Sequence, residues 1–100
     1  MKKDLNIVVK NVFGEDIFDE KGQPLTARKV VGTALIVPPP NKIQEMSADD
    51  KYECWKLASR IELENGVPDL SAQDIVRIKE LVGALFLPMV IGPVFELLDA

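Results

Sequence analysis

The sequence predicts a mainly helical α+β fold, with an N-terminal β-hairpin over residues 1–24 followed by three or four packed helices over residues 25–100. Ser47 and Ser71 are each followed three residues later by an aspartate, a pattern typical of a helix N-terminus. Apolar residues then recur at helical spacing, whereas the β-branched residues near the N-terminus favour strand. One hundred residues suffice for one modest core, so we expect a single domain.

The hairpin is expected from two short apolar stretches separated by turn residues. Residues 5–10 are rich in β-branched side chains, and residues 17–19 can form a second strand. Gly14 and Gly22 lie where the chain has to turn. Two strands alone are marginal in water, so they should lie on a helix or join the sheet of another chain.

Residues 27–37 carry signals for both helix and strand. Thr26 can cap a helix, and apolar residues follow the helical template at Ala27, Val30, Val31, Ala34 and Leu35. The β-branched pairs and Gly32 favour strand instead. We favour the helix and leave the strand open. Residues 38–40, three prolines, end this element and predict a rigid linker, with a proline-recognition ligand as the alternative.

The helix expected from Ser47 to about Glu64 has two apolar faces. One is the expected core stripe of Cys54, Leu57, Ala58 and Ile61. The other contains Tyr52, Trp55 and Leu63, well over a quarter-turn away. Either the hairpin covers this second stripe or another protein does. Because Trp and Tyr are common anchors of protein interfaces, Tyr52, Trp55 and Leu63 are our candidate interface residues.

The next helix begins at Ser71, where Leu70 and Ile75 occupy the positions of a hydrophobic staple. Its apolar face is expected to comprise Ile75, Ile78, Val82, Leu85 and Phe86. Residues 81–95 carry no charge but are too few, and too interrupted by glycine and proline, for a membrane span. We expect the helix to end near Leu87, and Pro88 or Pro93 to begin a last short helix.

The residue types argue against catalysis and against a cofactor or metal site. The chain has no histidine, which removes the commonest general base, and its glycines do not form a phosphate-binding loop. Cys54 is the lone cysteine, which we expect to be a buried small apolar side chain in a reducing cytoplasm. The net charge of −4 disfavours a nucleic-acid partner. No apolar segment follows the first lysines, so no secretory signal is visible.

Several core and cap positions follow a familiar arrangement: Leu25-Thr26, Val30 and Ala34-Leu35, then Tyr52, Leu57-Ala58 and Ile61, and finally Leu70-Ser71-Ala72 through Leu97-Leu98. Over residues 25–98 the chain resembles small bacteriophage and prophage proteins of unassigned function. The resemblance implies a phage-encoded protein in the cytoplasm of a bacterial host. Because it rests on core and cap residues, it transfers no functional site.

These observations together predict a small non-catalytic protein that acts by contact. We expect a protein–protein interaction or assembly module, which binds another protein or itself as a homodimer or other homo-oligomer. The alternative is an inhibitor or regulator that binds and occludes a host protein. Neither nucleic acid nor membrane is expected as a partner.

Overall fold

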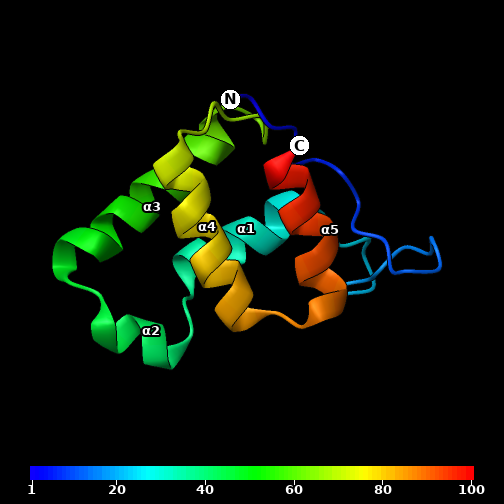
Figure 1. Cartoon of the computed structure of the whole chain (residues 1–100), viewed down its shortest axis with the longest axis horizontal. Helices are drawn as coiled ribbons and strands as arrows, with labels where there is room; N and C mark the ends of the chain where they lie inside the picture. The colour runs from blue at the N-terminus through cyan, green and yellow to red at the C-terminus, as the bar shows by residue number, and fades with distance from the viewer.

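Five helices account for most of the computed structural model, which describes residues 1–100 (Figure 1). They are α1 (Ala27–Ile36), α2 (Pro40–Glu45), α3 (Ala48–Leu63), α4 (Ala72–Leu85) and α5 (Pro88–Asp99). The mainly helical fold is thus confirmed, with one helix more than expected. The segment over residues 27–37, for which strand was left open, is helical from Ala27 to Ile36, and Val37 is its C-cap. No helix has both the length and the apolar character needed to cross a membrane.

Helix α1 lies near the middle of the molecule, where it crosses behind α4 in the view of Figure 1. Thr26 caps it by accepting a hydrogen bond from the Lys29 backbone N–H at 3.2 Å. All five side chains of its predicted apolar face are buried, namely Ala27, Val30, Val31, Ala34 and Leu35. Helix α1 contacts both α3 and α4, so one small helix organises most of the packing.

Helices α3 and α4 begin at the serines that the sequence indicated. Ser47 and Ser71 each accept a backbone hydrogen bond at 3.1 Å, from Asp50 and Asp74, and each aspartate side chain reaches back to the cap residue. On α3 the buried side chains are Cys54, Leu57, Ala58 and Ile61, as predicted. On α4 they are Ile75, Ile78, Leu81 and Val82, so Leu81 is buried where we expected Leu85. Pro88 opens α5, which packs against α4.

The N-terminal β-hairpin expected over residues 1–24 is not confirmed. Residues 1–26 form no sheet and contribute only isolated antiparallel bridges, such as Lys10 to Asp16 and Phe18 to Pro24. The chain changes direction about every eight residues here, so no segment runs straight for long enough to build a ladder of hydrogen bonds. The glycines do turn the chain, because Gly14 and Gly22 have φ of +81° and +79°.

Residues 9–24 instead form two consecutive turns of eight residues, here called turn 1 (residues 9–16) and turn 2 (residues 17–24). Three backbone hydrogen bonds join the starts of the turns to Leu25 in a closed ring. The Val9 N–H donates to the Leu25 carbonyl at 2.7 Å, Ile17 to Val9 at 3.0 Å, and Leu25 to Ile17 at 2.7 Å. The side chains of Val9 and Leu25 are buried and that of Ile17 packs against the core. The ring therefore fixes both turns to the helical body.

The two turns have the same internal hydrogen bonds. In turn 1 the Asn11 side-chain oxygen accepts from the backbone N–H groups of Phe13 and Glu15, at 2.9 and 3.0 Å. In turn 2 an oxygen of the Asp19 side chain accepts from residues 21 and 23, both at 2.9 Å. Each turn has a glycine of positive φ three residues after this Asn or Asp. Both turns are thus rigid, pinned by the side chain of their third residue.

Candidate functional site

The second apolar stripe of α3 is exposed. The exposed fractions are 57% for Tyr52, 57% for Trp55 and 83% for Leu63. Residues 1–26 do not cover these side chains, so the alternative in which an N-terminal hairpin buries the stripe is not what the structure shows. Nothing else in the chain takes that place. Three large apolar side chains therefore remain on the surface of a helix whose opposite face is fully packed.

Tyr52 and Trp55 lie one helical turn apart and stack on each other. Their ring centroids are 6.1 Å apart, and the ring planes are inclined by only 11°. The Lys56 ammonium lies 5.3 Å from the centre of the Tyr52 ring, a cation–π distance. Stacking holds the two rings in one orientation, so little side-chain freedom remains to be lost when another molecule covers them.

One side of Trp55 borders an apolar pocket of about 300 Å³. The pocket lies between the C-terminal end of α1, helix α2 and the first half of α3, and Lys51 supplies its one charged side chain. Its other lining residues are Leu35, Ile36, Pro38, Ile43, Met46, Cys54 and Trp55. The structure thus adds Ile36, Ile43 and Met46 to the surface that the sequence indicated through Trp55. These three residues were not predicted, because residues 38–40 were expected to form a rigid linker and no helix was expected directly after it.

The other side of Trp55 borders a larger and more polar groove between α3 and α4, of about 720 Å³. Leu63 lines the same groove, whereas Tyr52 lines neither the groove nor the apolar pocket and is connected to them through its stacking on Trp55. Across the groove, Arg60 pairs with Asp74 at 2.7 Å. Burial acts to raise the pKa of Asp74, but hydrogen bonds from Ser71 and Arg60 outweigh it and leave that pKa below its ordinary value. The groove charges are therefore already paired within the chain.

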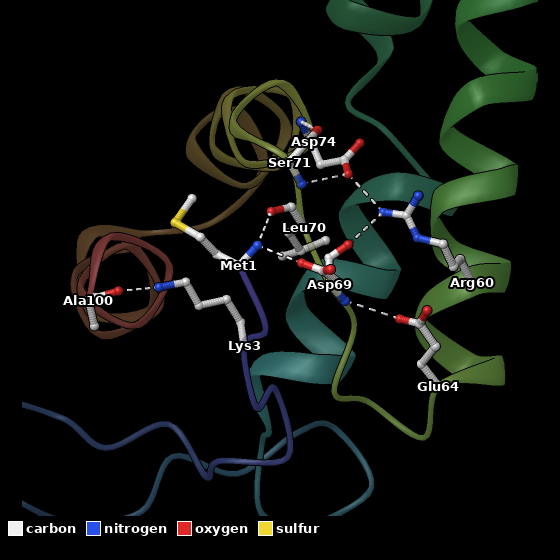
Figure 2. A network of polar contacts seen from close by, with 9 residues as sticks. All are labelled: Met1, Lys3, Arg60, Glu64, Asp69, Leu70, Ser71, Asp74 and Ala100. Atoms are coloured by element: carbon white, nitrogen blue, oxygen red, sulfur yellow. Dashed lines mark hydrogen bonds and ion pairs between the residues drawn. The ribbon is translucent and has the colours of Figure 1, made fainter.

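A second polar cluster connects the N-terminal segment to the loop between α3 and α4 (Figure 2). The Met1 ammonium donates to Asp69 at 2.5 Å and to the Leu70 carbonyl at 2.9 Å. Its hydrogen bond lowers the pKa of the Asp69 carboxyl. Figure 2 also shows Lys3 reaching the carbonyl of Ala100, the residue directly after α5. These contacts bind segments of the chain to one another, and we assign them a structural role.

Other polar contacts join α4 to α2 and α3. Lys42 on α2 pairs with Glu80 on α4 at 3.4 Å, and Arg77 on α4 donates to the Asp50 carbonyl on α3 at 3.2 Å. Cys54 is buried, and its sulfur lies 3.9 Å from an Arg77 nitrogen. His, Cys, Asp and Glu side chains nowhere gather in a group of three that could hold a metal ion.

The surface around Trp55, comprising the Tyr52–Trp55 stack, the apolar pocket and Leu63, is thus the strongest candidate site. Stacked rings beside an open apolar pocket can hold an apolar side chain presented by another molecule. We call it the Trp55 surface. No protein-family model, curated protein or solved structure matches this chain.

Proposed function

We propose that this protein is a small non-catalytic protein–protein interaction or assembly module, and that the Trp55 surface is where it binds its partner. The observation that carries the proposal is the exposed Tyr52–Trp55 stack beside an apolar pocket. Trp and Tyr are over-represented among the residues that dominate binding energies. The resemblance to small phage proteins supports assembly within a bacterial host as the setting.

The exposed area at Trp55 is large enough to matter energetically. A tryptophan can bury roughly 200 Å², so covering its exposed half is worth about 2–3 kcal/mol before ordering costs are subtracted. Helix α3 packs on the core through its opposite face, so the exposed part of the Trp55 ring does not contribute to folding stability. A partner that covers the ring would recover this free energy.

A photo-crosslinking amino acid in place of Tyr52 tests the proposal in the cell in which the protein is made. We expect one dominant crosslinked partner, and we expect the additional change Trp55→Ala to remove it. The matched control places the same crosslinker at Leu87, which is also apolar and exposed but lies between α4 and α5. Equal crosslinking from both positions, or crosslinking that persists in Trp55→Ala, would contradict the proposal. A capsid or tail protein as partner would support assembly, and a host enzyme would support the inhibitor alternative.

The folding stability of Trp55→Ala is the necessary companion measurement. Since Trp55 is more than half exposed, its loss should cost under about 1 kcal/mol of unfolding free energy, whereas a buried tryptophan would cost about 3–5 kcal/mol. Denaturant unfolding of the purified variant distinguishes the two cases. A loss in the higher range would mean that Trp55 serves the core and not a partner.

A further inference from the structure

Turns 1 and 2 have the same backbone design but opposite chemistry at their tips. Turn 1 presents Val12 and Phe13, which are 90% and 83% exposed, whereas turn 2 presents Glu20 and Lys21 at the equivalent positions. Turn 2 shows that the geometry forms perfectly well with a charged tip. The apolar tip of turn 1 is therefore not required by the turn itself, and exposing two large apolar side chains on a projecting loop calls for another explanation.

The tip is rigid and points away from the helices. The Asn11 side chain and the backbone hydrogen bond from Asn11 to Glu15, at 2.8 Å, fix the loop on both sides of Phe13. In Figure 1 the loop of residues 10–16 projects at one end of the molecule, and α2 and the start of α3 lie at the other end. The longest dimension is 39 Å, and the apolar pocket beside Trp55 is lined by residues of α2 and of the start of α3, away from the loop.

The turn 1 tip and the apolar pocket beside Trp55 each have one unpaired charged residue nearby, and the two charges are opposite in sign. Lys10 and Asp16 at the base of turn 1 neutralise each other at 2.5 Å, which leaves Glu15 beside the tip without an ion-pair partner. In the apolar pocket, Lys51 is the one charged lining residue, and it too forms no ion pair. An apolar tip next to an unpaired carboxylate thus matches an apolar pocket next to an unpaired ammonium.

We propose that the Val12–Phe13 tip of one copy docks into the apolar pocket beside Trp55 of a second copy, with Glu15 of the first facing Lys51 of the second. This proposal rests on the proposed function and names a partner for the Trp55 surface. The contact joins unlike surfaces, so a docked pair keeps one free pocket and one free tip, and further copies can add head to tail into a ring or a chain. One tip in one pocket is a small contact, so the association should be weak and concentration-dependent.

Sedimentation velocity on the full chain, with two complementary variants, tests this geometry. We expect the wild-type protein to grow in mass with concentration. Phe13→Ser removes the tip and Trp55→Ala damages the pocket, so each variant alone should associate roughly 30-fold more weakly. Mixed together, they should form a heterodimer and nothing larger, because the intact tip of Trp55→Ala fits the intact pocket of Phe13→Ser. An interface of tip on tip, or of Trp55 surface on Trp55 surface, cannot be restored in this way.

A charge exchange provides the second test and does not depend on any large truncation. Glu15→Lys and Lys51→Glu should each weaken association, and the double variant should recover most of it. Lys21→Glu, at the tip of turn 2, is the matched control and should leave association unchanged. Circular dichroism of every variant establishes that it is folded.

Two results would overturn the proposal. One is a wild-type chain that stays monomeric at millimolar concentration, and the other is a mixture of Phe13→Ser and Trp55→Ala that forms no heterodimer. Both leave the proposed function intact if the Tyr52 crosslinker still captures a different protein in a manner that depends on Trp55. If neither self-association nor that crosslink occurs, both proposals fail together.

Discussion

Turn 1 and turn 2 have the same backbone hydrogen bonds but different residues at their tips. Both start at a residue of the Val9–Ile17–Leu25 hydrogen-bonded ring, both are pinned by an Asn or Asp side chain, and both use a glycine of positive φ. Only the tips differ, apolar in turn 1 and charged in turn 2. The comparison separates what the fold requires from what it permits: the ring, the pinning side chain and the glycine are structural, and the tip residues are free to serve another purpose.

The largest effect should come from the ring that both turns share. Leu25→Ala removes a buried side chain at the residue that closes the ring, so we expect a loss of about 2–5 kcal/mol in unfolding free energy. Denaturant unfolding measures it, with Phe13→Ala as the exposed control. Equal losses for the two variants would mean that the ring is not part of the core.

The two glycines should respond alike, at a lower cost. A Cβ at Gly14 or Gly22 would meet no atom within 4 Å, so the penalty of Gly→Ala is one of backbone conformation alone. With φ near +80° at both positions, we expect about 1–2 kcal/mol for each alanine variant. Asparagine tolerates this conformation better, so Gly14→Asn and Gly22→Asn should cost less than the alanine variants. Clearly different losses of unfolding free energy for Gly14→Ala and Gly22→Ala would mean that the two turns are not structurally equivalent.

Acid should distinguish the turns, because only turn 2 is pinned by an ionisable side chain. The Lys29 ammonium, 2.6 Å from Asp19, and the Gln23 backbone N–H hold the pKa of this carboxyl below its ordinary value. A lowered folded-state pKa gives stability that is fully present above the unfolded value of about 3.9 and is lost as pH falls through the folded value.

Asp19→Asn keeps the pinning oxygen, as Asn11 does in turn 1, but removes this titration. The stability difference between wild type and Asp19→Asn should therefore be largest near neutral pH and should shrink as pH falls below about 4. Unfolding curves collected between neutral pH and pH 3 measure it. A difference that stays constant across this range would show that Asp19 does not titrate differently on folding.

The smallest change in stability should follow when the two tip residues of turn 1 are replaced by the residue types found at the tip of turn 2. The double variant Val12→Glu/Phe13→Lys alters two exposed side chains that make no core contact, so unfolding free energy should change by no more than about 0.5 kcal/mol. Thermal unfolding of the double variant beside wild type tests this. A substantial loss would mean that the apolar tip contributes to the fold after all.

Much of the helical part could be predicted because its signals are local. Ser47 and Ser71 are three residues before aspartates, and the Asn65-Gly66 pair, whose residue types are typical of a helix end, has positive φ just after α3. The apolar spacing in α1 identified all five of its buried residues. Helix α2 was missed because it is short, has no side-chain cap and begins within the proline run, where Pro40 occupies its first turn.

The paired turns and the state of the Trp55 surface could not be predicted in the same way. Val9, Ile17 and Leu25 recur every eight residues, but β-branched residues flanking a glycine are equally typical of a hairpin, and only the long-range ring decides between them. Spacing on α3 predicted two apolar stripes. Which stripe the rest of the chain covers depends on tertiary packing, so the exposure of Trp55 required the structure.

Trp55 is the only tryptophan in the chain, so its fluorescence reports directly on the central claim that the turn 1 tip and the Trp55 surface serve association and not folding. The measurement is quenching by acrylamide over a dilution series, for wild type and for Val12→Glu/Phe13→Lys. When dilute, both should be readily quenched. On concentration, wild-type Trp55 should become protected, and the variant should remain as accessible as before. Wild-type quenching that does not change with concentration, or equal protection in the variant, would contradict the account.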